Sequence, residues 1–409
     1  MKLNLLSKNS QNKLSTTISV IGLGYVGLPL AISAAQSGYE VNGIDVDRVK
    51  VELINSGKSP IEDISNLEIQ NVISSNLKVG SDFSPVEGSS IVIICVPTPL
   101  DVDRKPDLSL IDGAVKSFAK YLTKSTLVIL ESTVQPGTTR GYLVSLISKY
   151  SGLTPSEFNV AYSPERIDPA NRKWNLKNTP KIVAGLNPIT TKQAKDFYSK
   201  FVDNIIECES PEVAELAKLL ENTFRYVNIS FINELSIFCR SLGVDINQVI
   251  AAASTKPYGF MPFYPSIGVG GHCIPVDPLY LSDKARNIGV QTKFIDLADE
   301  INIQMPNFFV KVASERIGGL QGKKVLVIGV SYKPNVADIR ETPVAALIFS
   351  LRKEGAEVFW HDDLVKEWNE EKSSPLNQGY DLAILATPHD YLNLKQIGAV
   401  PLINTRGSI

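Results

Sequence analysis

The sequence predicts an α/β protein of two doubly wound domains joined by a long central helix, and three observations support this fold class. A strand, a glycine turn, a helix and a second strand follow one another over residues 17–45. A helical pattern occupies 211–242, and a second series of strands and helices begins at residue 323. Such alternation is typical of Rossmann-like domains, in which helices cover both faces of a parallel sheet.

The amino-terminal part opens with a βαβ unit. Its segment, TISVIGLGYVGLPLAISAAQSGYEVNGIDVD, starts at Thr17, and its second strand ends at Asp45. Apolar runs that follow predict further buried strands, separated by helix-length segments. Strands are expected at 90–99, 125–133, 158–165 and 181–185, and helices at 109–122 and 137–150. We therefore expect a dinucleotide-binding domain over residues 16–208.

The central part, residues 209–315, begins with the long helix. Ser210 and Pro211 are typical N-cap and first-turn residues, and Gly243 is a typical stop. Apolar residues recur between them on more than one helix face, which predicts that the helix lies between domains or subunits. Shorter helices and a glycine-rich loop around Cys273 are expected to fill the rest of this part.

The carboxyl-terminal part, residues 316–409, predicts a second α/β domain. It has only Gly329 at the end of its first strand and lacks G-x-G-x-x-G, so this turn is not built to hold a dinucleotide pyrophosphate in the usual way. Strands are expected at 323–334, 356–363, 380–388 and 401–407, and a helix at 342–355.

Composition narrows the class of protein. A chain of 409 residues with 44% hydrophobic and 21% charged residues is ordinary for a globular protein. Its formal net charge of -2 gives no broad basic field for nucleic acid or a membrane. The four cysteines and three histidines lack metal-ligand spacing and disulfide patterning, which favours the reducing cytoplasm and predicts no metal. Residues 1–15 read as a disordered lead-in and not as a signal peptide.

The glycine turn predicts a dinucleotide site. Gly22 permits the tight turn, Gly24 lets a pyrophosphate approach the backbone, and Gly27 allows close packing of helix and strand. Asp45 follows at about the expected spacing, where a carboxylate accepts hydrogen bonds from ribose hydroxyls and repels a 2′-phosphate. The pattern thus favours NAD over NADP, and the alternative is an α/β turn without a ligand.

Four further residues are candidates for chemistry, each with a plainer alternative. Cys273 lies among the glycines of 268–271 and is either a nucleophile or a buried small side chain. Lys218 and Asn222 share a face of the long helix, and the alternative is a solvated lysine and a surface asparagine. Glu165 follows a strand where α/β sheets bind ligands, or is a surface acid before a turn.

Taken together, these residues and several longer motifs resemble the UDP-glucose/UDP-N-acetylmannosamine dehydrogenase family. The resemblance runs in order from about residue 17 to residue 407. The motifs that carry it are GLGYVGLPLA, CVPTP, ESTVQPGTT, YSPERIDPANRKWNLKNTPKIV, ELAKLLENTFRYVNISFINEL, FMPFYPSIGVGGHCIPVDPLYL and SYKPNVADIRETP.

The resemblance implies an NAD-dependent four-electron oxidation of the C6 alcohol of a UDP-sugar to a carboxylate, with two NAD consumed per sugar. Cys273 would form a thiohemiacetal and then a thioester, and Glu165 would be the base for its hydrolysis. Lys218 and Asn222 would face the reacting oxygens, Asp277 would help to position water and the thiol, and Thr133 would order water beside the nicotinamide.

The resemblance also implies the binding residues. The cofactor set is Gly22, Gly24, Tyr25, Val26, Gly27, Asp45, Arg48, Pro97, Thr98, Thr133 and Arg340. The substrate set is Glu165, Arg166, Lys218, Asn222, Phe263, Tyr264, Gly270 and Lys333. The family further implies a homodimer or higher homo-oligomer and a role in polysaccharide biosynthesis.

The sugar is inferred from the residues around the thiol. His272 and Val276 resemble the branch of the family that acts on N-acetylhexosamines, and FMPFYP resembles UDP-N-acetylglucosamine 6-dehydrogenases. The alternatives are UDP-N-acetylmannosamine or UDP-glucose as the substrate. Two other classes compete, a two-electron β-hydroxyacid dehydrogenase, which needs no cysteine, and a nucleotide sensor without catalytic activity.

Overall fold

The computed structural model describes residues 16–61, 64–168, 171 and 173–407. The lead-in predicted for residues 1–15 lies outside the described residues. Contacts divide the chain into two compact units. The first unit comprises the described residues up to Thr98 and from Asp107 to Glu215, and the second comprises 99–106 and the described residues from Leu216 onward. The three-part division of the sequence stays a prediction.

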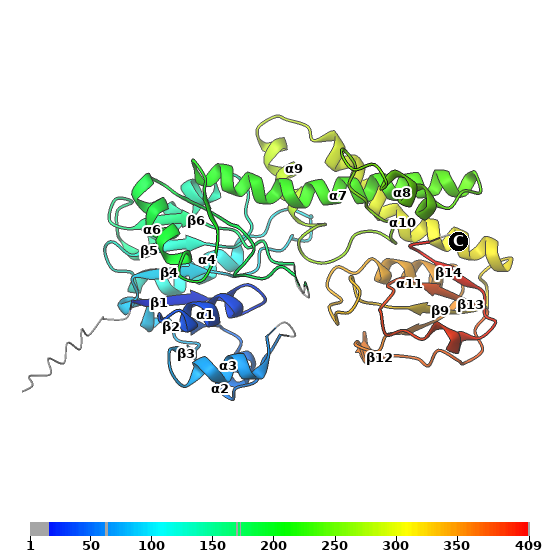
Figure 1. The fold of residues 1–409 in the computed structure, drawn as a ribbon, viewed down its shortest axis with the longest axis horizontal. Coiled ribbons are helices and arrows are strands. Elements are labelled where there is room, and N and C mark those ends of the chain that lie inside the picture. The colour runs from blue at the N-terminus through cyan, green and yellow to red at the C-terminus, as the bar shows by residue number, and fades with distance from the viewer. Residues whose placement is uncertain (1–15, 62–63, 169–170, 172, 408–409) are drawn as a thin grey trace, which may run out of the picture. The chain divides into compact units, whose positions relative to one another are not determined.

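The first unit is built on an eight-stranded sheet in the order β3-β2-β1-β4-β5-β6-β7-β8 (Figure 1). Its strands are β1 (Thr17–Ile21), β2 (Glu40–Ile44), β3 (Leu77–Gly80), β4 (Ile91–Ile94), β5 (Leu127–Leu130), β6 (Asn159–Tyr162), β7 (Lys181–Gly185) and β8 (Ile205–Glu207). Its helices are α1 (Gly27–Gln36), α2 (Arg48–Asn55), α3 (Asn66–Ile73), η1 (Ser84–Gly88), α4 (Ser109–Phe118), η2 (Ala119–Tyr121), η3 (Thr138–Leu143), α5 (Val144–Ser151) and α6 (Pro188–Tyr198).

The predicted parallel sheet is confirmed with one exception, the antiparallel pairing of β6 with β7. A parallel connection needs a crossover, usually a helix, whereas the described residues between these two strands form none. The order reverses between β1 and β4, and in such sheets ligands bind at the carboxyl ends of the strands near this switch. The core lies between the strands and helices such as α1, which buries Leu28, Leu30 and Ile32.

The central elements begin with α7 (Pro211–Ser241), a single helix of 31 residues. It is followed by α8 (Ile246–Ala253), α9 (Asp277–Asn287) and α10 (Lys293–Ile317). As expected, the helices after α7 are shorter than α7, and the longest of them, α10, runs for 25 residues through Pro306. Met305, Phe309 and Val312 are buried beside this proline, and their packing offsets the lost backbone donor. Among the described residues, no helix has the length and apolarity that a membrane crossing requires.

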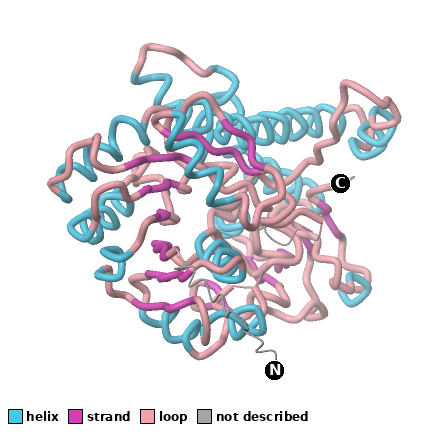
Figure 2. The backbone as a smooth tube through the Cα atoms, turned by 60° about the vertical axis from the view of Figure 1, so that its left-hand side comes forward, coloured by secondary structure: helices cyan, strands magenta, loops and turns pink. Residues whose placement is uncertain are grey.

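The carboxyl-terminal elements form a second α/β arrangement, as the sequence predicts. Four parallel strands lie in the order β10-β9-β13-β14, and Figure 2 shows strands and helices in contrasting colours. The elements are β9 (Lys324–Ile328), α11 (Val344–Lys353), β10 (Glu357–His361), β13 (Leu382–Leu385), η4 (Leu394–Ile397) and β14 (Leu402–Asn404), with a small hairpin of β11 (Glu367–Trp368) and β12 (Glu371–Lys372). The predicted fold class is confirmed.

Candidate active site

The turn between β1 and α1 has the geometry that a dinucleotide pyrophosphate requires. Gly22 has a φ of +89°, and a Cβ there would lie 2.8 Å from the carbonyl oxygen of Cys95. A Cβ on Gly27 would lie 1.8 Å from the carbonyl oxygen of Gly22, so only glycine permits this packing. A Cβ on Gly24 would meet no atom within 4 Å, which leaves space beside the backbone for a ligand.

Asp45 closes β2 beside this turn and is held in a fixed orientation. Its Oδ2 accepts a hydrogen bond from the main-chain N–H of Leu23 at 2.8 Å and pairs with Lys50 Nζ at 2.8 Å. Its Oδ1 accepts from the N–H of Asp47 at 2.9 Å. The aspartate is 7% exposed, and this arrangement suits a carboxylate that accepts hydrogen bonds from ribose hydroxyls.

The other cofactor residues expected in the first unit lie at strand ends or at the starts of helices. Tyr25 and Val26 occupy the glycine turn and are half-buried, and Arg48 begins α2 and is exposed. Pro97 and Thr98 follow β4, and Thr133 follows β5. Because β1, β2, β4 and β5 run parallel, the residues that follow them lie along one edge of the sheet.

Glu165 follows β6, and its carboxylate is held within its own turn. Its Oε1 accepts hydrogen bonds from the main-chain N–H groups of Arg166 and Ile167 at 2.6 and 2.7 Å. Its Oε2 lies 3.6 Å from Lys181 Nζ and has no hydrogen-bond partner among the described residues. A small cavity of about 10 Å³, enough for one water molecule, adjoins Glu165, Arg166 and Lys181.

A buried cluster behind Glu165 was not predicted from the sequence. Lys181 Nζ donates to Glu131 Oε2 at 3.1 Å and to the carbonyl oxygen of Pro164 at 3.3 Å, and Tyr198 donates its hydroxyl to Glu131. Burial lowers the pKa of Lys181, but the charges of Glu131 and Glu165 outweigh it and leave that pKa raised. The ammonium group is therefore charged beside Glu165. The sequence signal for this cluster was Lys181, an ionisable residue at the start of the apolar strand β7.

In the second unit, the predicted nucleophile lies just before α9. Cys273 is exposed, and its Sγ lies 3.2 Å from Nδ1 of His272. Its carbonyl oxygen accepts the N–H groups of Val276 and Asp277, so the chain enters α9 directly after the thiol. Asp277 is buried, and its Oδ2 accepts from Asn222 Nδ2 at 2.5 Å. The contact of His272 with the thiol was not predicted.

Charges around the thiol set its protonation state. Desolvation and the carboxylate of Asp277 raise the pKa of Cys273 to about 11, against the opposing charges of Lys218 and Arg340. Cys273 is exposed, but the upward direction holds because the charge of Asp277 acts in the same sense. Burial also raises the pKa of Asp277 to about 6 and lowers that of His272. The thiol is therefore protonated at neutral pH.

The remaining candidates in the second unit include residues that pack against the loop that carries Cys273. Gly271 donates its N–H to the carbonyl oxygen of Arg340 at 3.1 Å, and the Arg340 side chain pairs with Asp338. A Cβ on Gly270 would lie 2.7 Å from Tyr332 Cβ, so this glycine allows the two loops to pack. Phe263, Lys218 and Lys333 are half-buried and Tyr264 is exposed.

The structure thus groups the expected residues by unit. Asn222, Cys273 and Asp277 come together in the second unit, and the charge of Lys218 acts on both the thiol and the carboxylate. Thr133, Glu165, Arg166 and the glycine turn belong to the first unit. Within the described parts of the chain, no cluster of three or more metal-ligating side chains is present.

Comparison with known families gives three consecutive matches. Residues 16–202 match the NAD binding domain, 212–304 the central domain and 326–405 the UDP binding domain of the UDP-glucose/GDP-mannose dehydrogenase family. The resemblance drawn from the sequence is therefore confirmed, and so is NAD as the cofactor.

The names of individual relatives specify two different sugars. The chain is 34% identical to the UDP-N-acetyl-D-glucosamine 6-dehydrogenase of Pseudomonas aeruginosa, over 93% of this chain and 92% of that protein. It is also 34% identical to the UDP-N-acetyl-D-mannosamine dehydrogenase of Methanocaldococcus jannaschii, over 94% and 88%. The solved UDP-D-ManNAc dehydrogenase of Pyrococcus horikoshii superposes with a TM-score of 0.88 at 33% identity, covering 96% of each chain.

A more distant likeness concerns the competing two-electron class. A 3-hydroxyisobutyrate dehydrogenase from Mycobacterium tuberculosis superposes with a TM-score of 0.54 at 15% identity, over 83% of this chain and all of that one. At this identity the likeness shows a shared fold and carries no argument about the reaction.

Proposed function

Because the chain belongs to the UDP-glucose/GDP-mannose dehydrogenase family, whose members are NAD-dependent oxidoreductases, we propose that it oxidises the C6 hydroxyl of a UDP-N-acetylhexosamine to a carboxylate. The observation that carries this proposal is the arrangement at Cys273. An accessible thiol lies beside His272, and Asp277, which follows within one helical turn, is buried and hydrogen-bonded to Asn222 of α7. A two-electron alcohol dehydrogenase needs no such nucleophile.

The first unit fits NAD. The open space at Gly24 would admit the pyrophosphate, and Asp45 would accept hydrogen bonds from the adenosine ribose. From the same unit we further assign Tyr25, Val26, Arg48, Pro97, Thr98 and Thr133 to the cofactor, and from the second unit Arg340. When bound, NAD supplies the hydride acceptor, and two equivalents are required to take an alcohol to a carboxylate.

The residues of the second unit fit covalent capture of the sugar. Once C6 is at the aldehyde level, Cys273 Sγ forms a bond to C6, its proton leaves, and the carbonyl oxygen gains charge. Lys218 and Asn222 stabilise that oxygen, which is the usual role of preorganised donors. After the second oxidation the sulfur is joined to C6 as a thioester. Release of the carboxylate then requires hydrolysis of this thioester by an activated water molecule.

Hydrolysis of the thioester is assigned to Glu165 as base, with Asp277 and Thr133 positioning water. One water oxygen adds to C6, the C–S bond breaks, and the thiol recovers its proton. The main-chain N–H groups of Arg166 and Ile167, with Lys181 Nζ at 3.6 Å, orient the Glu165 carboxylate that would take a proton from this water. Arg166, Phe263, Tyr264, Gly270 and Lys333 are assigned to the nucleotide sugar.

We propose UDP-N-acetylglucosamine as the preferred sugar. The support is the pattern of His272 and Val276 around the thiol, together with the segment FMPFYP. Curated relatives at 34% identity carry both epimers in their names, so UDP-N-acetylmannosamine remains the main alternative. Epimers that differ at one centre are distinguished by few contacts, which family membership does not specify.

The direct test is the number of NADH formed per sugar consumed. UDP-N-acetylglucosamine, UDP-N-acetylmannosamine and UDP-glucose would be offered separately to the purified protein. We expect two NADH per UDP-N-acetylglucosamine and a lower kcat/KM for the other two. One NADH per sugar would contradict the four-electron scheme, and turnover of none of the three would contradict the proposed substrate class.

The role of the thiol is tested by Cys273→Ala. We expect this variant to form no uronate while it binds NAD with the affinity of the wild-type protein, because the cofactor residues are unchanged. Cys208→Ala is the matched control, since Cys208 is half-buried and has no assigned role. Uronate release by Cys273→Ala at the wild-type rate would exclude the covalent mechanism.

A homodimer is also part of the proposal. Large apolar side chains on α7 are exposed in the chain, including Leu220 at 61%, Phe231 at 57% and Phe238 at 58%. Steps of seven or eleven residues place them on one face of the helix. We propose that a second copy of the chain covers this face.

A further inference from the structure

The second α/β unit repeats the local geometry of the NAD turn. In the first unit, Gly22 donates its N–H to the carbonyl oxygen of Ile44 at 2.8 Å, and Leu23 donates to Asp45 Oδ2 at 2.8 Å. At the matching place in the second unit, Gly329 donates to the carbonyl oxygen of His361 at 2.8 Å, and Val330 donates to Asp362 Oδ2 at 2.9 Å. Asp362 therefore stands where the ribose-binding acid of a dinucleotide domain would stand.

The environment of the two acids differs. Asp45 is partnered by Lys50, whose side chain is 25% exposed. Asp362 is partnered by His389, whose Nε2 lies 3.1 Å from Oδ2, and both side chains are fully buried. Leu364 and Val365 donate their N–H groups to the other oxygen, Oδ1. The carboxylate of Asp362 is thus enclosed by partners from its own chain and cannot receive a ribose.

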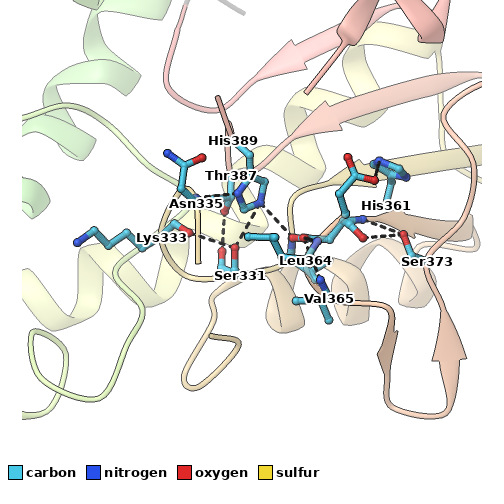
Figure 3. Close-up of polar contacts among 12 residues, drawn as sticks. Ser331, Lys333, Asn335, His361, Leu364, Val365, Ser373, Thr387 and His389 are labelled. Carbon is cyan, nitrogen blue, oxygen red and sulfur yellow. Dashed lines mark hydrogen bonds and ion pairs between the residues drawn. The ribbon is translucent and has the colours of Figure 1, made fainter. Parts of the chain in front are cut away.

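The contacts of His389 fix its tautomer. Its Nδ1 lies 2.9 Å from the main-chain N–H of Asn335, as Figure 3 shows. A main-chain N–H can only donate, so Nδ1 accepts and the proton lies on Nε2, directed toward Asp362. Burial acts to raise the pKa of Asp362, but hydrogen bonds from His389 and Val330 hold it below its usual range. A neutral imidazole therefore links a buried carboxylate to the backbone of residue 335.

The segment held in this way is the anchor loop, residues 331–335, which follows β9. Thr387 donates its hydroxyl to the carbonyl oxygen of Ser331 at 2.7 Å, and Ser331 Oγ donates to the carbonyl oxygen of Lys333 at 3.1 Å. Asn335 has a φ of +64°, and its side chain exchanges two hydrogen bonds with Asp390. The main chain on both sides of Lys333 is fixed, and its side chain extends away from the cluster (Figure 3).

We propose that His389 is a positioning residue for the nucleotide sugar, which holds the anchor loop so that Lys333 is presented to the UDP moiety. The proposal rests on the proposed function, in which Lys333 contacts the nucleotide sugar. In this arrangement Asp362, at the end of β10, does not bind a ligand. It orients the histidine, the histidine orients the loop, and only the lysine meets the substrate.

Two substitutions separate the contact of Nδ1 from those of Nε2, which lies 3.1 Å from Asp362 Oδ2 and 3.4 Å from Ser331 Oγ. His389→Asn keeps an acceptor near the Nδ1 position for the N–H of Asn335, whereas His389→Gln keeps a donor near the Nε2 position for Asp362. We expect the Kd for UDP, measured by calorimetry, to rise roughly tenfold in His389→Gln and to stay within about threefold of wild type in His389→Asn. The Kd for NAD is expected to be unchanged in both.

Hydrogen exchange reports on the same bond without any ligand. The amide of Asn335 is expected to be protected in the wild-type protein and in His389→Asn, and to exchange faster in His389→Gln. If His389 served only packing or charge balance at Asp362, His389→Gln would be the milder change. Weaker UDP binding in His389→Asn than in His389→Gln would therefore overturn the proposal.

A double-mutant cycle with Lys333→Ala tests whether the histidine acts through the lysine. We expect the tenfold effect of His389→Gln on the Kd for UDP to fall below about twofold when Lys333 is already absent. An undiminished effect would overturn the positioning role. If His389→Gln fails to fold, Thr387→Val removes the contact to Ser331 and is expected to behave in the same way in the cycle. Failure of the wild-type protein to bind UDP would instead contradict the proposed function itself.

Discussion

At the scale of single residues, Cys273 is protonated in the free protein, whereas its proposed role as a nucleophile requires the thiolate. A thiolate is the reactive form, yet desolvation and, after it, the carboxylate of Asp277 raise the pKa of the thiol. Asp277 has a pKa of about 6, so above neutral pH its negative charge is present and opposes ionisation of the sulfur. The free protein therefore keeps the nucleophile protonated, and the proton must leave when Cys273 attacks.

Asp277→Asn tests this coupling. Asparagine retains an oxygen that accepts from Asn222 but removes the charge, so the pKa of Cys273 should fall by about one unit. The rate of alkylation by iodoacetamide, followed for the Cys273 peptide by mass spectrometry between pH 6 and pH 11, should rise at lower pH in the variant. Cys208 provides the internal control. Superimposable pH profiles for variant and wild type would show that Asp277 does not influence the thiol.

Some site residues could be predicted from the sequence and others could not. The two groups differ in how far apart in the chain the interacting residues lie. Gly22, Gly24 and Asp45 could be predicted because a short βαβ unit fixes their separation. The pair of Asp362 and His389 could not, because β10 and β13 lie on opposite sides of β9, and only the strand order brings their ends together. The spacing of the histidines in the sequence does not predict such a contact.

At the scale of elements, the first turn of α7 carries an unusual buried acid. Glu215 is fully buried, and its two oxygens accept the main-chain N–H groups of Gly137 and Thr139 at 2.6 and 2.8 Å. It therefore fixes the start of α7 against the first turn of η3 and the glycine that precedes it. Burial raises the pKa of Glu215 to about 7, although these hydrogen bonds oppose the shift.

This carboxyl should make stability depend on pH. Its folded pKa lies above the unfolded value near 4.5, so its contribution is complete below that pH and is lost as pH rises toward 7. Glu215→Gln cannot titrate. We expect the Tm of the wild-type protein minus that of the variant to decrease from pH 4.5 to pH 7.5, by the equivalent of at most about 3 kcal/mol. A difference that is constant over this range would mean that Glu215 does not titrate there.

Element prediction succeeded where the pattern was local. Ser210, Pro211 and Gly243 delimit α7 closely because capping and stop signals are properties of a few adjacent residues. The continuation of α10 through Pro306 and the antiparallel pairing of β7 with β6 depend instead on contacts with other parts of the fold. These are tertiary effects, which local propensity does not encode.

At the scale of the whole molecule, the expected catalytic and substrate-binding residues are drawn from distant parts of the chain. Glu165 belongs to the first unit, whereas Cys273 and Lys333 belong to the second. Family motifs could assign roles to all three because the motifs recur in order along the chain. Lys181 lies within one of these motifs but was not singled out there, and His389 lies outside them, because the contacts of both side chains form only in the folded chain.

The exposed face of α7 gives a prediction about assembly. Leu220, Phe231 and Phe238 form an apolar stripe, and a two-fold axis across it would pair the stripe with its own copy. Phe231→Glu with Phe238→Glu would place two like charges on each side of that contact. We expect light scattering to give the mass of a dimer for the wild-type protein and of a monomer for the double variant.

Phe349→Glu is the matched control for that experiment. Phe349 lies on α11 and is 69% exposed, so it is as apolar and accessible as the α7 side chains but lies outside the stripe. Its substitution should leave the dimer mass unchanged, which would separate a specific interface from general hydrophobic association. A wild-type protein that is monomeric at tens of micromolar would contradict the proposed dimer. A double variant that remains dimeric would place the contact elsewhere, because two buried charges per chain cannot be accommodated in an apolar interface without loss of affinity.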